Sequence, residues 1–157
     1  MLYFALKYLH IMGAAVLIGT GSGIAFFMLA AHLQRNPIVI AGVARIVVIA
    51  DFIFTATAVI VQPITGVLLA LHAGYPLSEG WIVWSIALYI FIGALWLPVV
   101  WMQMRLRDLA SAAANKNTSL PDEYHRIFWY WCAFGVPAFA AIALILWLMV
   151  AKPQVGF

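Results

Sequence analysis

Residues 45–72 read RIVVIADFIFTATAVIVQPITGVLLALH, and this stretch decides the fold. It exceeds the about 20 apolar residues that a helix needs to cross a bilayer, yet it contains Asp51, Thr55, Gln62 and Thr65. At about 100° per residue, these four side chains fall within about 40° of one line along a helix. Facing lipid, the acid alone would cost roughly 2.5 kcal/mol or more. We therefore predict a spanning helix whose polar stripe faces other helices and forms the candidate functional site.

The composition excludes a water-soluble domain. Of the 157 residues, 67% are hydrophobic and 8% are charged, and the mean hydropathy is +1.07, whereas soluble domains are about a quarter charged. The apolar runs are continuous rather than alternating, which excludes a β-barrel and leaves an all-α, transmembrane four-helix bundle. The net charge of +3 comes from connecting segments and predicts no nucleic-acid binding. The single cysteine, Cys132, excludes an intramolecular disulfide and the C-x-x-C-H attachment of a c-type haem.

Four apolar segments predict four spanning helices in a single integral membrane domain over residues 1–157. Their approximate ranges are 2–31, 45–72, 81–104 and 127–151. The first apolar run is too long for a signal peptide and is predicted to be an uncleaved span. Its small residues are predicted to allow close approach of neighbouring helices: Gly13, Ala14, Gly19, Gly21 and Gly23.

Basic residues distinguish the two sides of the membrane. The segments 32–44 and 105–126, both predicted to be loops, contain or adjoin Arg35, Arg45, Arg105, Arg107, Lys116 and Arg126. The opposite side holds only Lys7 and Lys152. Because basic residues accumulate on the cytoplasmic side, we expect both termini to lie outside the cytoplasm.

The four histidines also separate by side. His10 and His72 fall near the outer ends of the first two helices, and His32 and His125 fall near the inner ends, where we expect them to be solvated. Adjacent antiparallel helices could place His10 and His72 opposite each other as neutral imidazole ligands of a haem iron or another metal. The alternative is that each is an interfacial histidine that only hydrogen-bonds a carbonyl.

Asp51 is expected to be either protonated or paired, because an isolated carboxylate inside a membrane is costly. Its possible ion-pair partners are Arg45, Arg105 and Arg126, and Gln103 is a possible hydrogen-bond donor. One interpretation is a proton relay or a clamp for a polar group of a cofactor. The other is a structural ion pair between helices.

Two further polar and sulfur-containing features favour packing roles. Gln62 is expected to bond a neighbouring helix near mid-membrane. The six methionines are not spaced as a copper site and are predicted to be packing residues.

Three strings carry a family resemblance: LKYLHIMGAAVLIG, RIVVIADFIFTATAVIVQPITGVLLALHAGYPLSEGW and LYIFIGALWLPVVWMQMRLRDLA. They resemble a bacterial family of predicted four-helix integral membrane proteins, over nearly the whole chain. More distantly, the LHIMG of the first helix is similar to the opening of HemJ-type protoporphyrinogen oxidases and of CopD copper-resistance proteins. The HemJ resemblance implies that His10 is a haem b ligand. The bacterial resemblance implies a multi-pass protein of the inner membrane, with both termini on the periplasmic side.

The sequence thus predicts a haem b-binding membrane protein in electron transfer or redox chemistry, with a haem-dependent membrane oxidoreductase as one form of this function. His10 is the expected axial ligand and His72 the candidate second one. The expected partners of the protein are the lipid bilayer and either a membrane redox protein or a second copy of the chain. The alternatives are a non-catalytic structural or assembly subunit of a larger membrane complex, and a protein that handles copper or small solutes.

Overall fold

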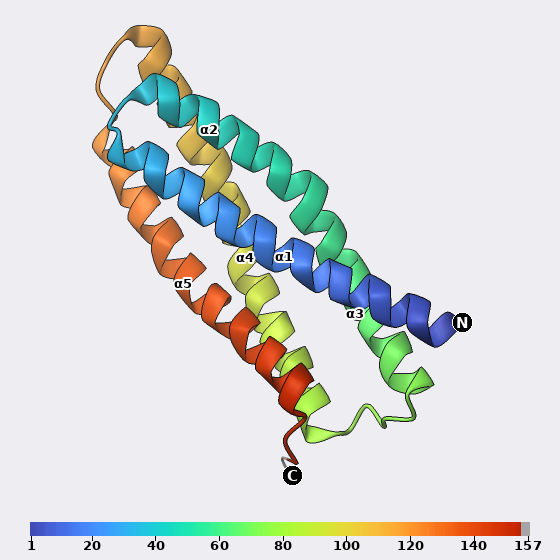
Figure 1. Ribbon diagram of the computed structural model, residues 1–157. Coiled ribbons are helices and arrows are strands. Elements are labelled where there is room, and N and C mark those ends of the chain that lie inside the picture. The colour runs from blue at the N-terminus through green and yellow to red at the C-terminus, as the bar shows by residue number, and fades with distance from the viewer. Residues whose placement is uncertain (155–157) are drawn as a thin grey trace.

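The computed structural model describes residues 1–154, and all of its regular structure is helical. In chain order the elements are α1 (Leu2–Leu33), α2 (Pro37–Ala50), η1 (Asp51–Thr55), α3 (Ala56–His72), α4 (Gly80–Lys116) and α5 (Asp122–Ala151). The elements α2, η1 and α3 follow one another without a break and form a single long rod (Figure 1). The four rods are each long and apolar enough to cross a membrane, which confirms the predicted all-α fold with four spans.

The second rod begins at Pro37, eight residues before the predicted start at Arg45. Asn36 caps it, because the Asn36 side chain accepts a hydrogen bond of 2.9 Å from the Ile38 N–H. Proline is favoured in the first turn of a helix, where its missing N–H is not needed. The predicted loop over 32–44 is therefore reduced to a turn of three residues, 34–36, in which Arg35 adopts a left-handed φ of 55°.

The predicted loop over 105–126 is also largely helical. Helix α4 continues to Lys116, and α5 begins at Asp122. The extension of α4 contains LASAAANK, and alanine is the strongest helix former. An ion pair of 2.8 Å between Arg105 and Glu123 joins the two helices across the remaining connection.

The element η1 is a π-helical turn in the middle of the second rod. Such turns insert wider i→i+5 hydrogen bonding into an α-helix and are frequent at functional sites. The wider turn changes the angle between residues before and after it, so the uniform 100° spacing assumed from the sequence does not hold through Asp51–Thr55.

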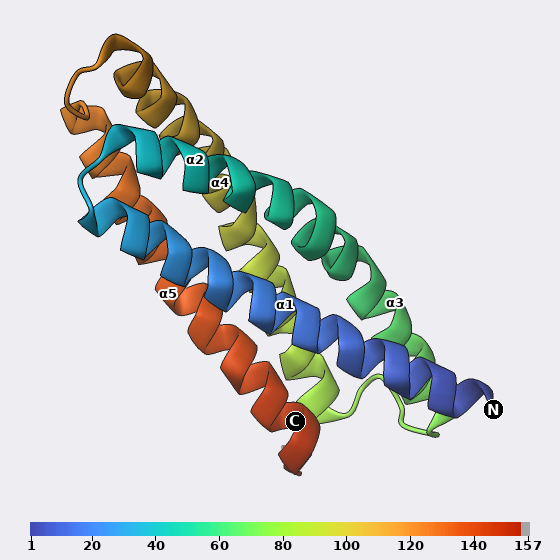
Figure 2. The same cartoon turned by 45° about the horizontal axis from the view of Figure 1, so that its top comes forward.

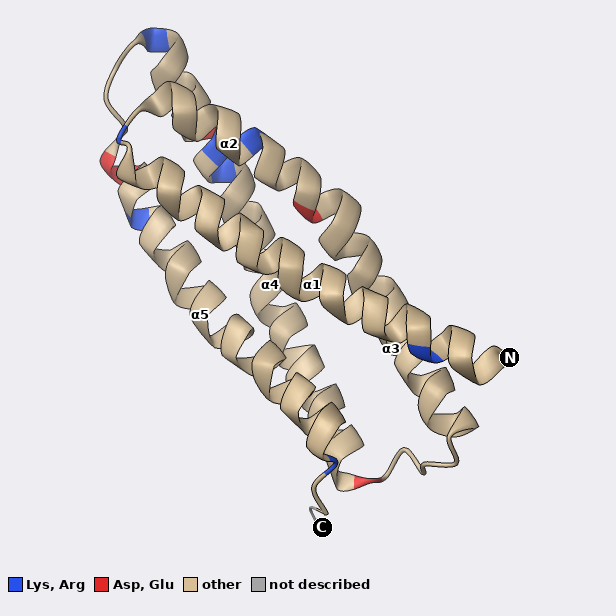
Figure 3. Ribbon diagram, in the orientation of Figure 1, with Lys and Arg blue, Asp and Glu red and all other residues tan. Residues whose placement is uncertain are grey.

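The bundle consists of two helix pairs. In Figures 1 and 2, α1 runs beside the α2–η1–α3 rod, and α4 runs beside α5. Helix α2 packs against α4 and joins the pairs at one end, whereas α3 and the start of α1 diverge from the other pair. We call the joined end the basic end, because Arg35, Arg45, Arg105, Arg107, Lys116 and Arg126 lie toward it, and the opposite end the terminal end (Figure 3).

The main core lies toward the basic end. Buried side chains of α1, α2, α4 and α5 form it, with Tyr124, Phe128 and Leu106 fully enclosed. Met28 and Met102 also lie in this core, as expected for packing methionines. A smaller cluster of Ala70, Trp81, Ile82 and Leu148 lies at the terminal end.

A contact from the end of α5 reinforces this smaller cluster. Lys152 ends α5 with a left-handed φ of 43°, and its Nζ donates a 3.1 Å hydrogen bond to the Tyr75 hydroxyl. The same ammonium lies 4.7 Å from the centroid of the Tyr75 ring, within the range of a cation–π interaction. The connection between α3 and α4 is thereby attached to the end of α5.

Candidate functional site

His10 and Thr65 meet between α1 and α3. The Nδ1 atom of His10 lies 3.1 Å from the Thr65 hydroxyl oxygen, and Thr65 is buried. The same hydroxyl donates to the backbone carbonyls of its own helix, at 2.9 Å from Val61 O and 3.1 Å from Gln62 O. A threonine hydroxyl has only one hydrogen, so when that hydrogen is donated to the helix backbone, the oxygen accepts a hydrogen bond from the His10 ring.

Two tautomers of His10 satisfy this arrangement. In one, Nδ1 accepts from the Thr65 hydroxyl; in the other, Nδ1 carries the proton and donates to Thr65, which leaves the lone pair of Nε2 available. Metal-bound histidines commonly hold their second nitrogen in this way, because the hydrogen bond orients the ring. His10 therefore has the donor chemistry of a metal ligand, and the same bond also serves to join two helices.

Two glycines let α1 and α3 approach closely around His10. A Cβ placed on Gly66 would lie 2.9 Å from Cε1 of the His10 ring, which is too close for an ordinary contact. A Cβ placed on Gly13 would collide with the side-chain oxygen of Gln62. The close approach predicted for the small residues of the first helix is thus observed at Gly13. At Gly19 and Gly21 an added Cβ would meet no atom within 4 Å, so these glycines are not needed for packing within the described chain.

His72 does not lie opposite His10. The contact between His10 and Thr65 sets the antiparallel register of α1 and α3, and His72 follows Thr65 by seven residues, or about 10 Å along the helix. The side chain of His72 is exposed at the end of α3. The two predicted ligands are therefore separated. Within residues 1–154 no group of three or more His, Cys, Asp or Glu side chains could hold a metal ion.

Asp51 is buried in the π-helical turn, with 3% of its surface exposed. The indole Nε1 of Trp96, on α4, donates a long hydrogen bond of 3.4 Å to Oδ1 of the carboxylate. Oδ2 is buried and has no hydrogen-bond partner within the described residues, and neither has the hydroxyl of Thr55. Asp51 is thus an acid inside a membrane span with one oxygen unsatisfied.

None of the three arginines proposed as partners forms an ion pair with Asp51. Arg105 pairs with Glu123, and the two ion pairs found within residues 1–154 both lie toward the basic end. Arg45 and Arg126 are exposed. Arg45 precedes Asp51 by six residues, about 9 Å along the rod, and helical geometry turns it toward the surface. Gln103 follows Trp96 by seven residues on α4, so it lies about 10 Å along that helix from the indole that contacts Asp51.

The residues of the predicted polar stripe have partners on two helices. Asp51 accepts a hydrogen bond from Trp96 of α4, whereas Gln62 and Thr65 are contacted from α1. The π-helical turn itself packs against α1, so Trp96 reaches Asp51 from α4 with its long side chain. Gln62 does approach the neighbouring helix at Gly13, but its Oε1 is buried without a hydrogen bond among the described residues. Tyr89 of α4 donates to the Val59 carbonyl and links α4 to α3 at mid-bundle.

Of the two histidines toward the basic end, His125 is exposed as expected, whereas His32 is half-buried among aromatic rings. His32 stacks on Phe128 at a centroid distance of 3.8 Å, and its Nδ1 lies 3.4 Å from the Tyr124 hydroxyl. His125 lies edge-on to His32 at 5.8 Å. The sequence prediction missed this cluster because it joins residues about 90 positions apart, although both histidines had been placed on the same side of the membrane.

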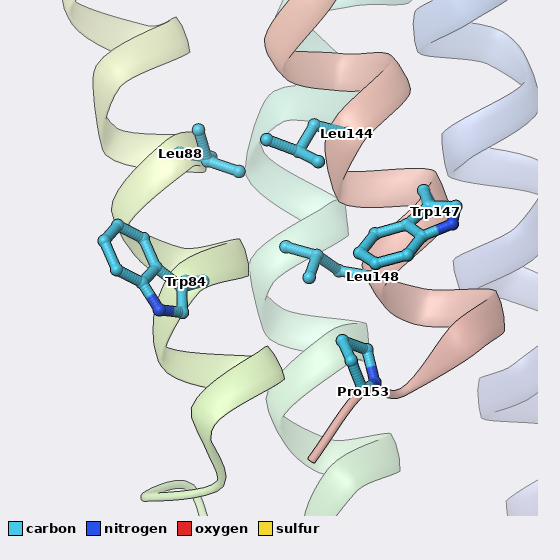
Figure 4. Close-up of a pocket in the computed structure, with 6 residues that line it drawn as sticks. All are labelled: Trp84, Leu88, Leu144, Trp147, Leu148 and Pro153. Atoms are coloured by element: carbon cyan, nitrogen blue, oxygen red, sulfur yellow. The ribbon is translucent and has the colours of Figure 1, made fainter. Parts of the chain in front are cut away.

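An apolar cavity lies at the terminal end. Its volume is about 310 Å³, and it is lined by Trp84 and Leu88 of α4, Leu144, Trp147 and Leu148 of α5, and Pro153. Figure 4 shows Leu88, Leu144 and Leu148 projecting into the space between the two helices. None of the predicted site residues lines this cavity, and its walls are those of an ordinary lipid-facing surface.

The fold and the buried polar groups define a multi-pass integral membrane protein with four spanning helices. The chain belongs to the family described as predicted integral membrane protein (DUF2269), which it matches over residues 4–153. No curated protein and no solved structure matches the chain.

Proposed function

We infer that this protein binds haem b in the membrane and takes part in membrane redox chemistry, with His10 as an axial ligand. The observation that carries this proposal is the 3.1 Å contact between Nδ1 of His10 and the Thr65 hydroxyl, since the tautomer that donates from Nδ1 leaves Nε2 able to bind iron. Bound haem would supply one-electron chemistry. The distant resemblance of the first helix to HemJ-type proteins supports the same residue.

The donor set fits one axial position. His10 is held by Thr65, and its ring packs where Gly66 has no side chain. His72 is not proposed as a second ligand, because its side chain is exposed and lies about 10 Å farther along α3 than Thr65. If His10 were the one protein ligand, bound haem would supply reaction with a substrate as well as electron transfer.

Asp51 provides a protonatable group for the same function. It lies 14 residues before Thr65, about 20 Å along the rod toward the basic end. A carboxylic acid inside a membrane is characteristic of proton pathways, and the unpartnered Oδ2 is where a proton would be held. By the positive-inside rule, the basic end faces the cytoplasm of a bacterial cell, so Asp51 would exchange its proton with that side.

The test is a spectrum of the detergent-purified protein from haem-replete cells, oxidised and then reduced with dithionite. We expect a Soret band and sharpened α and β bands in the wild type and in His72→Ala, and loss of these bands in His10→Ala. Added imidazole should restore the bands in His10→Ala, because it replaces the missing ligand. A folded but colourless wild type, or equal spectra for the two variants, would overturn the proposal.

A second candidate, a structural or assembly subunit of a larger membrane complex, is supported by Gly19 and Gly21. Neither glycine is needed for packing within the described chain, and small residues are the usual contact points between membrane helices. Native electrophoresis of mild-detergent extracts distinguishes this candidate. It predicts a complex larger than the single chain, which Gly21→Leu disrupts.

A further inference from the structure

A polar cavity lies at the basic end, between the α1–α2 turn and the α4–α5 connection. Its volume is about 370 Å³, which falls within the range of small-molecule sites. The residues that line it are His32, Arg35, Ser119, Leu120 and His125. None of these is acidic, so the walls offer hydrogen-bond donors and positive charge without a carboxylate.

His32 is fixed in this cavity by aromatic packing. Its ring lies nearly parallel to that of Phe128, with an interplanar angle of 6°. Nδ1 lies within hydrogen-bonding distance of the Tyr124 hydroxyl, and both Tyr124 and Phe128 are fully buried. No hydrogen bond within residues 1–154 engages Nε2, which leaves that nitrogen for a ligand. His125 brings a second imidazole to within 5.8 Å, measured between ring centroids.

Arg35 brings a permanent positive charge to the same cavity. Its guanidinium forms neither of the two ion pairs found within the described residues, which use Arg105 and Arg107. Its backbone has a φ of 55°, a conformation that a side chain other than glycine or asparagine adopts only at an energetic cost. The three-residue turn and the Asn36 cap hold Arg35 in place between α1 and α2.

We propose that this cavity binds a phosphate group. A guanidinium presents a planar fork of donors that matches phosphate oxygens, and imidazole and serine hydroxyl groups add further donors. A metal cation is disfavoured, because Arg35 would repel it and no lining carboxylate would compensate. The cavity lies where α1 ends and α5 begins, two helices apolar and long enough to span a membrane, so the phosphate belongs either to a lipid headgroup or to a soluble phosphate compound.

The variant that tests this is Arg35→Asn. It removes the guanidinium, and asparagine tolerates the left-handed conformation of position 35, so the turn is expected to keep its shape. The matched control is Arg126→Gln. Arg126 is an exposed cation next to His125 in sequence, but it does not line the cavity. His125→Gln serves as a second site variant with an unaltered turn.

The readout is the NMR signal of ¹⁵N-labelled histidine at constant pH. In a maltoside detergent, which contains no phosphate, inorganic phosphate and glycerol phosphate are titrated separately. In nanodiscs, a phosphate-free glycolipid membrane is compared with the same membrane containing phosphatidylglycerol. We expect the signals of His32 and His125 to shift on binding, with about tenfold or more weaker binding in Arg35→Asn and nearly unchanged binding in Arg126→Gln.

The two sources of phosphate give different results, and each supports the proposal. A response to the soluble compounds identifies a soluble phosphate ligand, and a response only to phosphatidylglycerol in nanodiscs identifies a lipid headgroup. Two results would overturn the proposal. One is that neither histidine responds to any of these probes. The other is that Arg35→Asn and Arg126→Gln weaken binding equally, which would mean general attraction to the basic end.

Discussion

Trp96 donates its indole hydrogen to the carboxylate of Asp51 at 3.4 Å, and this bond joins α4 to the π-helical turn of the second rod. The Thr55 side chain also interacts with the carboxylate, whereas Oδ2 has no hydrogen-bond partner of good geometry within the described residues. Burying an acid with so few partners costs stability. The proposed function gives its proton a role.

Replacing Asp51 by asparagine is therefore expected to leave the free energy of unfolding unchanged or to raise it. The amide keeps the shape and can still accept from Trp96, while the cost of a buried acid is removed. Equilibrium unfolding in mixed detergent measures the effect, with Asp108→Asn at the exposed Arg107–Asp108 pair as the control. A loss of more than about 2 kcal/mol would instead show that the carboxylate is paired in the folded protein.

Thr65→Val is expected to weaken haem binding by about 10- to 100-fold without unfolding the protein. Valine keeps the size of the side chain but cannot accept the hydrogen bond from Nδ1 of His10, which orients the ring. Titration of haem into the purified apoprotein gives the affinity. Thr57→Val is the matched control, because Thr57 donates to the Ile53 carbonyl in the same way but is exposed. Equal affinities for both variants would contradict the proposed role of Thr65.

Gly66→Ala is expected to destabilise the protein by about 1–3 kcal/mol, since the added methyl group would overlap the His10 ring. Gly13→Ala should cost less, because its methyl group would meet the end of the Gln62 side chain, which can rotate. Gly93→Ala is the control and should be neutral or stabilising, because an added Cβ there meets no atom within 4 Å. Thermal unfolding in detergent ranks the three variants, and a neutral Gly66→Ala would contradict the packing described for His10.

The orientation of the bundle is testable with reporter fusions. We expect alkaline phosphatase fused to the C-terminus to be active and a green fluorescent protein at the same position to be dark, as for a periplasmic terminus. Insertion of each reporter in the turn after Asn117, at the basic end, should give the reverse pattern. The same pattern at both positions would disprove a periplasmic C-terminus with a cytoplasmic basic end.

The number of spans was predictable from the sequence because it depends only on the length of apolar runs. The residues at which the helices begin and end were harder to predict, although the sequence contains the signals. Asn36-Pro37 is a typical helix start, and LASAAANK has high helix propensity. Contacts between helices were not predictable. Whether His10 meets Thr65 or His72 depends on the register of two antiparallel helices, and the π-helical turn altered the faces on which Asp51 and Thr65 lie.

Three residues other than glycine have left-handed backbones within the described chain: Arg35, Asn117 and Lys152. Glycine at such positions would make the protein more stable by roughly 1–2 kcal/mol. Asparagine at position 117 reduces this cost, but arginine and lysine do not. Arg35 brings its charge to a cavity, and Lys152 brings its charge to Tyr75. At these two helix ends, a left-handed arginine or lysine lowers the stability of the fold but places a positive charge. Selection for more stable variants should therefore favour glycine at both positions, and both contacts would be lost.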